Sequence, residues 1–154
     1  MNSTEEDYAI VAFGNIDGRD RTLSADDVFK SLFDSGLWYV TRRSNAIHPG
    51  TRVLFYQSGK GFRGTAVVRD VVEDSTDRLL GTQIMGRFSH RLLLSECRPF
   101  ENWVDIREML ARLEFVTNKT YWGQAFRTTP RRISEADFMA IMAKAKVRGA
   151  KTDA

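Results

Sequence analysis

The alternation of hydrophobic and polar positions predicts one strand and one capped helix in the first quarter of the chain. Residues 8–13, YAIVAF, are apolar throughout and rich in strand-favouring side chains, which indicates a buried strand. Ser24 then stands three residues before Asp27, as in a helix N-cap, and an apolar stripe follows at helical spacing. We therefore expect an amphipathic helix that ends near Gly36.

The middle of the chain has the pattern of antiparallel strands. A Pro-Gly turn signal at 49–50 precedes residues 52–57, RVLFYQ, which are dense in hydrophobic and aromatic side chains. The glycine-rich residues 58–61 connect this segment to a second apolar run over 61–73, so the two segments predict a hairpin. Gly64 inside the second run indicates a bulge or a close approach by another part of the molecule.

Further strands and two more helices are expected in the C-terminal half. Residues 82–95 predict one long strand or two short ones. Asn102 stands three residues before Asp105, and Ser134 stands three residues before Asp137, so each pair predicts the start of a capped helix. The apolar positions of the first of these helices are Trp103, Ile106, Leu110 and Leu113.

The order of these elements favours an α+β fold. A parallel α/β sheet would need a helix after nearly every strand, whereas here the strands follow one another. We expect a small, curled, mostly antiparallel β-barrel flanked by about three helices. One domain should span residues 1–146, and the small and charged residues 147–154 should form a flexible C-terminal tail.

The composition indicates a folded globular protein, and the distribution of charge indicates a basic face. With 42% hydrophobic and 28% charged residues, the chain has the composition of a folded globular domain. Acidic residues gather in 1–7 and 70–77, whereas the stretch before the last predicted helix is basic and almost free of acid. This segregation predicts a basic face that could meet phosphates. The basic residues of that stretch are Lys119, Arg127, Arg131 and Arg132.

The sequence gives little support for a metal site or a catalytic nucleophile. The single cysteine, Cys97, excludes an internal disulfide and a cysteine-based zinc cluster. His90 lies seven residues before it, so on one strand the two side chains would point to opposite faces. The acidic run over 70–77 is typical of a solvated surface. We therefore expect no enzyme activity, no metal and no cofactor.

The chain is expected to be cytoplasmic and not to enter a membrane. No apolar run approaches the roughly 18 to 20 residues that cross a bilayer. The first residues, MNSTEEDY, are acidic and lack the order of a secretory signal.

Three groups of aromatic, basic and polar residues are candidates for nucleic-acid contact. The first group follows the first predicted helix and holds Trp38, Tyr39, Arg42, Arg43 and Asn45. The second lies around the turn of the hairpin and holds Phe55, Tyr56, Ser58 and Lys60. The third precedes the last predicted helix and holds Lys119, Tyr121, Trp122, Arg127 and Arg131.

Each group combines flat rings with cations, which suits unstacked bases and their phosphates. We expect the aromatic residues, with Asn45 and Ser58, to bind a base, and the lysines and arginines to bind phosphates. The aromatic residues of all three groups are equally typical of a hydrophobic core, and this alternative stays open at the level of the sequence.

Two segments carry a resemblance to a known family. LFYQSG over 54–59 and YWGQAFR over 121–127, with RRIS after it, resemble the EVE domain of the PUA-like superfamily, to which YTH and ASCH domains are related. The similarity spans residues 8–142. It departs from the family at the first strand, where YAIVAFGNID replaces a tryptophan with a Lys-Ser-Glu-Pro run, and the ASCH motif G-x-K-x-x-E-x-R is absent.

The resemblance implies a cleft that accepts a base, often a modified one, flipped from its strand. By position it assigns the walls to Trp38, Tyr56 and Trp122, and the reading of the base edge to Ser58 and Asn45. The expected function is a nucleic-acid-binding module for DNA or RNA, with the cleft between residues 53–59 and the 121–127 loop. The alternatives are a metal-independent ribonuclease that uses Lys, Tyr and Arg, and a protein-interaction module on the same aromatic surface.

Overall fold

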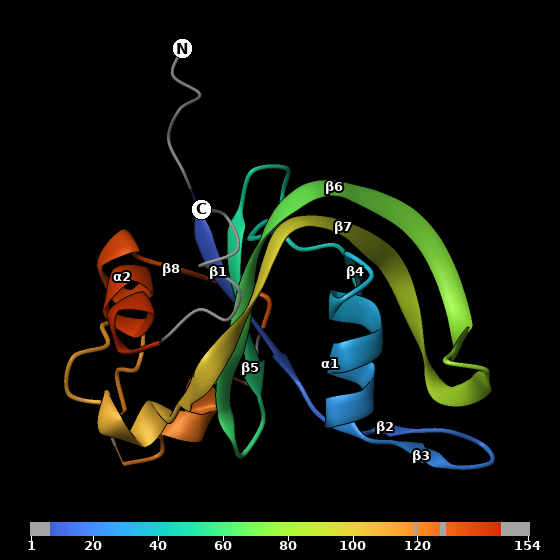
Figure 1. Cartoon of the computed structure of the whole chain (residues 1–154), viewed down its shortest axis with the longest axis horizontal. Helices are drawn as coiled ribbons and strands as arrows, with labels where there is room; N and C mark the ends of the chain where they lie inside the picture. The colour runs from blue at the N-terminus through green and yellow to red at the C-terminus, as the bar shows by residue number, and fades with distance from the viewer. Residues whose placement is uncertain (1–6, 119, 127–128, 146–154) are drawn as a thin grey trace.

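The computed structural model describes residues 7–118, 120–126 and 129–145 (Figure 1). The fold is mixed α+β and consists mostly of strands. The strands are β1 Tyr8–Phe13, β2 Ile16–Asp17, β3 Thr22–Leu23, β4 Leu37–Val40, β5 Arg52–Gln57, β6 Gly61–Leu79, β7 Thr82–Val104 and β8 Arg131–Ile133. The helices are α1 Ala25–Phe33, α2 Glu135–Lys144 and two short 3-10 helices, η1 Ile106–Glu108 and η2 Trp122–Phe126.

Six strands form one sheet in the order β4-β7-β6-β5-β1-β8. All neighbours are antiparallel except β1 and β5, which run parallel with Val11 opposite Phe55. The hairpin predicted from the sequence is confirmed as β5 and β6, and the strand predicted over 82–95 is one continuous part of β7. β2 and β3 form a separate two-stranded sheet.

The main sheet is a curled half-barrel and not the complete barrel that the sequence led us to expect. The long strands β6 and β7 arch over α1, which lies on the concave side of the arch (Figure 1). Apolar side chains of α1 pack there against residues of both strands in one hydrophobic core. We infer that the sheet stays open because this helix occupies the space around which it curls.

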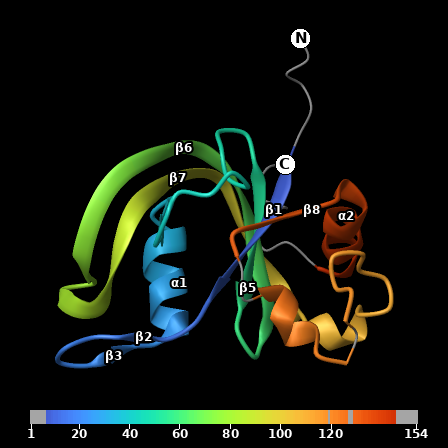
Figure 2. The same ribbon diagram turned by 180° about the vertical axis from the view of Figure 1, so that it is seen from behind.

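Both faces of the central strands are buried, as the uninterrupted apolar run of β1 indicates. Along β5, Val53 and Phe55 belong to the core on the α1 side, whereas Leu54 and Tyr56 belong to the core on the other side. α1 and α2 lie on opposite sides of β1 and β5 when the molecule is seen from behind (Figure 2). The sheet therefore separates two cores, and any cavity in one core is distinct from a cavity in the other.

The first and last predicted helices are confirmed, with the expected caps. The hydroxyl of Ser24 accepts a hydrogen bond from the backbone N–H of Asp27, and that of Ser134 accepts one from the N–H of Asp137, each at 3.1 Å. Gly36 follows α1 with a φ of +73°, the left-handed conformation that glycine adopts at little cost.

The helix predicted to start at Asn102 is absent from that segment, so the described part of the chain has two α-helices and not about three. β7 continues through this segment, and Val104 pairs with Phe62 of β6. Asp105 instead caps the short η1, where its carboxylate accepts from the N–H of Arg107 at 2.9 Å. Hydrogen bonds to a strand about forty residues away outweigh the local capping signal, and sequence spacing alone does not reveal them.

The close approach expected at Gly64 is present. A Cβ atom there would lie 3.0 Å from the carbonyl oxygen of Arg98 and 3.2 Å from the ring of Phe33. The register of β6 against β7 also shifts between Phe62 and Gly64. A side chain at Gly64 would push α1 away from the sheet, so this glycine helps to hold the helix close.

The tail predicted over residues 147–154 lies outside the described residues. In the part of the chain that the structure describes, no helix combines the length and the apolar character needed to cross a membrane.

Candidate functional site

A cavity of about 180 Å³ lies where β1 ends, against α1 and β4. An apolar cavity of about 150 Å³ can hold a benzene ring, so this one has room for a single planar ring. Its walls include the four aromatic side chains Phe13, Trp38, Tyr39 and Phe88. Six stretches of the chain thus meet around it, the last being Thr129 and Pro130 just before β8.

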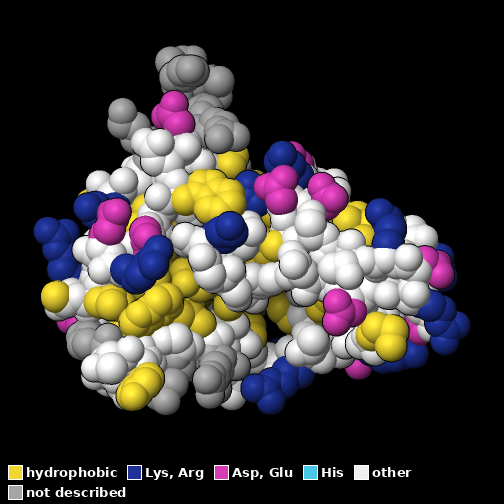
Figure 3. Space-filling view, turned by 90° about the horizontal axis from the view of Figure 1, so that it is seen from below, with side chains coloured by type: hydrophobic (Ala, Val, Ile, Leu, Met, Phe, Trp, Pro, Cys, Tyr) yellow, Lys and Arg dark blue, Asp and Glu magenta, His cyan; other side chains and the backbone are white. Residues whose placement is uncertain are grey.

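The molecule seen from below is hollowed between the half that holds α1 and the half that holds α2 (Figure 3). Hydrophobic side chains lie within this hollow, and Lys and Arg side chains lie beside it.

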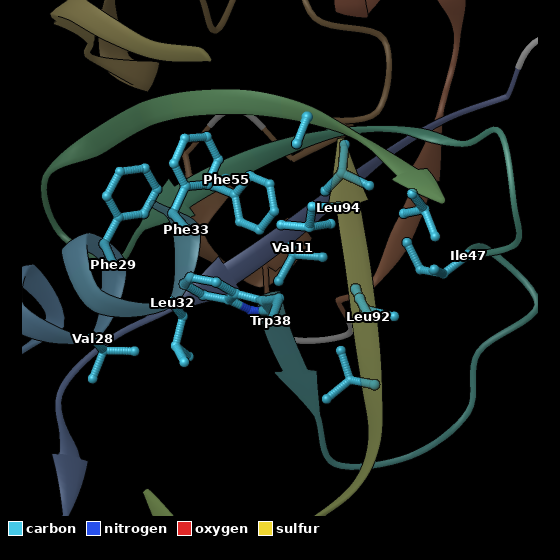
Figure 4. Close-up of a cluster of buried hydrophobic side chains, with 14 of the residues drawn as sticks. Val11, Val28, Phe29, Leu32, Phe33, Trp38, Ile47, Phe55, Leu92 and Leu94 are labelled. Atoms are coloured by element: carbon cyan, nitrogen blue, oxygen red, sulfur yellow. The ribbon is translucent and has the colours of Figure 1, made fainter. Parts of the chain in front are cut away.

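Trp38 forms a fixed wall of the cavity. Its ring packs at 75° against Phe13 and at 66° against Phe55, with centroids 5.1 Å and 4.9 Å apart. Only 3% of the residue is exposed, and the side chain lies among the core residues beside α1 (Figure 4). Among the described residues, no hydrogen bond involves its indole N–H. Trp38 is therefore a core residue and a cavity wall at once, as both interpretations of the sequence allowed.

Tyr39 and Phe88 form a second, more accessible wall. Their ring centroids lie 5.7 Å apart with an interplanar angle of 35°, and both side chains are half-buried. Both residues line the cavity, and they come from the neighbouring strands β4 and β7. Tyr39 and Phe88 therefore leave part of their ring surface open to a ligand. The tightly packed ring of Trp38 leaves much less.

Two polar side chains in the cavity wall are held in place by backbone groups. The side-chain oxygen of Asn15 accepts a hydrogen bond from the N–H of Ala25 at 2.8 Å. The hydroxyl of Thr129 accepts one from the N–H of Ala12 at 3.1 Å. With its oxygen so used, Asn15 has its side-chain NH₂ group left as a donor. The cavity thus combines apolar walls with a positioned hydrogen-bond donor.

Two positively charged residues come directly after a residue of the cavity wall in the sequence. Thr41 lines the cavity, and the exposed Arg42, Arg43 and Asn45 come directly after it in the loop that follows β4. Within the described part of the chain, neither arginine has a carboxylate within ion-pair distance. Their charge is therefore available to an anionic ligand.

The turn between β5 and β6 reaches the same rim. The backbone N–H of Ser58 donates to the carbonyl oxygen of Phe13 at 2.8 Å. A Cβ atom at Gly14, which lines the cavity, would lie 3.9 Å from the Cβ of Ser58. Ser58 and Lys60 are both exposed in this turn. The structure thus brings Ser58 close to the site that also holds Trp38 and Tyr39.

Phe55 and Tyr56 do not reach this site as exposed residues. Phe55 is fully buried in the first core, and Tyr56 is 3% exposed in the second. The ring of Tyr56 stacks on Phe126 of η2 at 4.0 Å and 12°, and its burial raises the pKa of its hydroxyl. Tyr56, which was expected to wall the cleft between residues 53–59 and the 121–127 loop, is therefore a packed core residue with no open ring face for a base.

The third predicted group lies at a second cavity, of about 210 Å³, in the core on the α2 side. Tyr121, Trp122 and Arg131 line it, whereas Lys119 and Arg127 lie outside the described residues. Trp38 and Trp122 therefore belong to different cavities on the two sides of the sheet. The other lining residues are Phe115, Val116, Thr117, Asn118 and Ala125.

Three residues of the cavity wall were not predicted from the sequence: Asn15, Phe88 and Thr129. Phe88 and Thr129 join the site only through long-range pairing of β7 and β8, which leaves no local mark. Asn15 did have a local signal, because it is a polar residue two positions after a buried strand and ahead of a capped helix.

Cys97 and His90 do not form a nucleophile and base. Burial, with a smaller contribution from Asp34, raises the pKa of the Cys97 thiol to about 11, so it stays protonated near neutral pH. A ring nitrogen of His90 lies instead 2.7 Å from the hydroxyl of Ser89. Among the described residues, no three His, Cys, Asp or Glu side chains are grouped so that they could hold a metal ion.

Neither the protein-family models nor the curated proteins compared with the chain give a match.

Proposed function

We propose that the chain is a nucleic-acid-binding module of the EVE and PUA-like kind, which holds one base, including a modified one, in the cavity at the end of β1. The observation that carries this proposal is the cavity itself. It has about the volume of one planar ring, four aromatic side chains in its walls and the Asn15 amide as a positioned donor.

The base would enter beside Tyr39 and Phe88, whose rings retain open surface. Asn15 would donate from its NH₂ group to an acceptor on the edge of the base, since its oxygen is already engaged by Ala25. Taking a base out of a stack costs on the order of a few kcal/mol, and stacking on aromatic rings returns about 1–3 kcal/mol per base. Stacking and one or two hydrogen bonds are therefore sufficient for binding.

The phosphates beside the bound base would meet Arg42, Arg43 and Lys60, which are exposed around the rim. Ordered phosphate contacts of this kind give most of the affinity and little of the specificity. The proposal therefore assigns base recognition to the cavity and backbone attraction to these cations.

The test is a titration of the protein with short single-stranded DNA and RNA, plain and modified, at several salt concentrations. We expect log K to fall linearly with log salt, with a slope of about 0.7 for each phosphate contact. Arg42→Gln and Arg43→Gln should each reduce the slope by about that amount. Arg69→Gln, on the exposed part of β6, is the matched control and should leave it unchanged.

Absent binding, or binding that does not change with salt, would contradict the proposal. Cleavage of the RNA in the presence of EDTA would favour the metal-independent ribonuclease. A protein that stays bound to the chain after nuclease treatment would favour the protein-interaction module.

A further inference from the structure

The two cavities meet at one short segment of the chain. Thr129 and Pro130 lie in the wall of the first cavity, and Arg131 lies in the wall of the second. Consecutive Cα atoms are at most about 3.8 Å apart, so the backbone of the two walls is separated by less than about 8 Å. The segment leads into β8, the edge strand of the sheet. The two cavities are therefore neighbours at the edge of the sheet.

Arg131 gives the second cavity an unbalanced positive charge. The residue is half-buried, and its guanidinium lies 5.6 Å from the ring of Phe115 and donates to the carbonyl oxygen of Ala125 at 3.4 Å. Across the described ranges, no carboxylate lies within ion-pair distance of Arg131. A guanidinium has five N–H donors in a planar fork, so most of them are left for an anion such as phosphate.

The rest of the second cavity suits a nucleotide. Tyr121 is 67% exposed, which leaves a ring face for stacking. The side-chain oxygen of Asn118 accepts from the N–H of Thr120 and of Tyr121, so its NH₂ group remains as a donor. The second cavity thus offers a stacking surface, a cation and a hydrogen-bond donor. The first cavity offers the same three kinds of group from other residues.

We propose that the ligand is a single strand of at least two nucleotides, with one base in the first cavity and the neighbouring nucleotide in the second. Arg131 binds the phosphate that joins them or follows them, and Tyr121 stacks on the second base. This inference rests on the proposed function, because it takes the first cavity as the site of the first base. Bases stacked in a duplex cannot separate around the edge of a sheet, whereas those of a single strand can be splayed apart.

The experiment compares a nucleoside, its dinucleotide and a pentanucleotide, each as DNA and as RNA, on the full chain. We expect the dinucleotide to bind at least about tenfold more tightly than the nucleoside, which is the effect of one additional stacked base. Tyr121→Ala and Arg131→Gln should remove this gain and leave the affinity for the nucleoside unchanged. Arg69→Gln is the control for the loss of one positive charge.

The possible failures are distinguishable. If the oligonucleotides bind more tightly than the nucleoside but both second-cavity variants keep this gain, the second subsite is wrong while the proposed function stands. If the nucleoside and the oligonucleotides bind equally, the phosphates add nothing, and both the second subsite and the phosphate contacts of the proposed function are wrong. If no nucleic acid binds to the wild-type protein, the proposed function is wrong and this inference fails with it. Circular dichroism of Arg131→Gln shows whether that variant is folded, and the exposed Tyr121 provides the test if it is not.

Discussion

The side-chain oxygen of Asn15 accepts a hydrogen bond from the backbone N–H of Ala25, the first residue of α1. The first N–H groups of a helix have no partner within the helix, so this bond satisfies one of them. It also joins the end of β1 to the start of α1, between which the base-sized cavity lies. One hydrogen bond thus serves both the fold and the orientation of a donor in the site.

Asn15→Asp separates these two roles. A carboxylate has the same shape, can still accept from the N–H of Ala25 and is favourable near a helix N-terminus, but it lacks the NH₂ donor. We expect the affinity for a nucleoside to fall about tenfold or more, because the donor is worth about 1–3 kcal/mol. The free energy of unfolding should change by less than about 1 kcal/mol.

Calorimetric titration and urea unfolding measure the two quantities. The nucleoside is used because it carries no phosphate that the new carboxylate could repel. Asn15→Ala is the companion variant, and it should lose both affinity and stability. Unchanged nucleoside affinity in Asn15→Asp would remove Asn15 from the site.

Trp38→Ala is expected to act mainly on stability. Since the side chain is 3% exposed and packs against Phe13 and Phe55, its loss should cost about 3–5 kcal/mol of unfolding free energy. Tyr39→Ala, at the half-buried wall, should cost less stability and should lower the affinity for a base by about tenfold. Urea unfolding and titration of both variants check this. A Trp38→Ala protein as stable as the wild type would contradict the core position of the ring.

The parts of the fold that the sequence predicted are those with local causes. The caps at Ser24 and Ser134 are each set by residues within one turn, so α1 and α2 could be located. The end of β7 could not be located from the sequence, because Val104 pairs with Phe62 from another part of the chain. The capping pattern at Asn102 gives no information about that pairing.

The candidate site shows the same division. Trp38 and Tyr39 could be identified from one short aromatic segment, but nothing in the sequence placed Phe88 beside them. The sequence also suggested one cleft for Trp38 and Trp122, which in fact line cavities on the two sides of the sheet. Strand alternation predicts that neighbouring residues face opposite sides, but it does not tell which distant segment covers each side.

Asp137 should be among the most sensitive positions of the second core. Its carboxylate is 1% exposed and accepts from the N–H of Glu114 at 2.9 Å and from that of Phe115 at 3.0 Å. Asp137→Ala leaves both N–H groups without this acceptor, which we expect to cost about 2–5 kcal/mol of unfolding free energy. Ser134→Ala removes only the cap of α2 and should cost about 1 kcal/mol. Equal losses in urea unfolding would contradict this role of Asp137.

Phe115 lines the second cavity, so Asp137 also positions part of its wall. If Asp137→Asn folds, we expect the gain in affinity from a second nucleotide to be reduced while nucleoside affinity is kept.

Cys97 should be unreactive at neutral pH and become reactive only in strong base. Burial raises the pKa of its thiol to about 11, and the thiolate is the form that reacts with iodoacetamide. Near pH 8 about one thiol in a thousand is then ionised, compared with about a quarter for an ordinary cysteine with a pKa of about 8.5. The alkylation rate of the folded protein, followed by mass spectrometry, should rise about tenfold per pH unit up to about pH 10.5.

The same measurement in urea is the control, because unfolding returns the thiol to water and should make it react rapidly near pH 8. A folded protein that is alkylated as fast as the unfolded one at this pH would show that Cys97 is not shielded by the sheet.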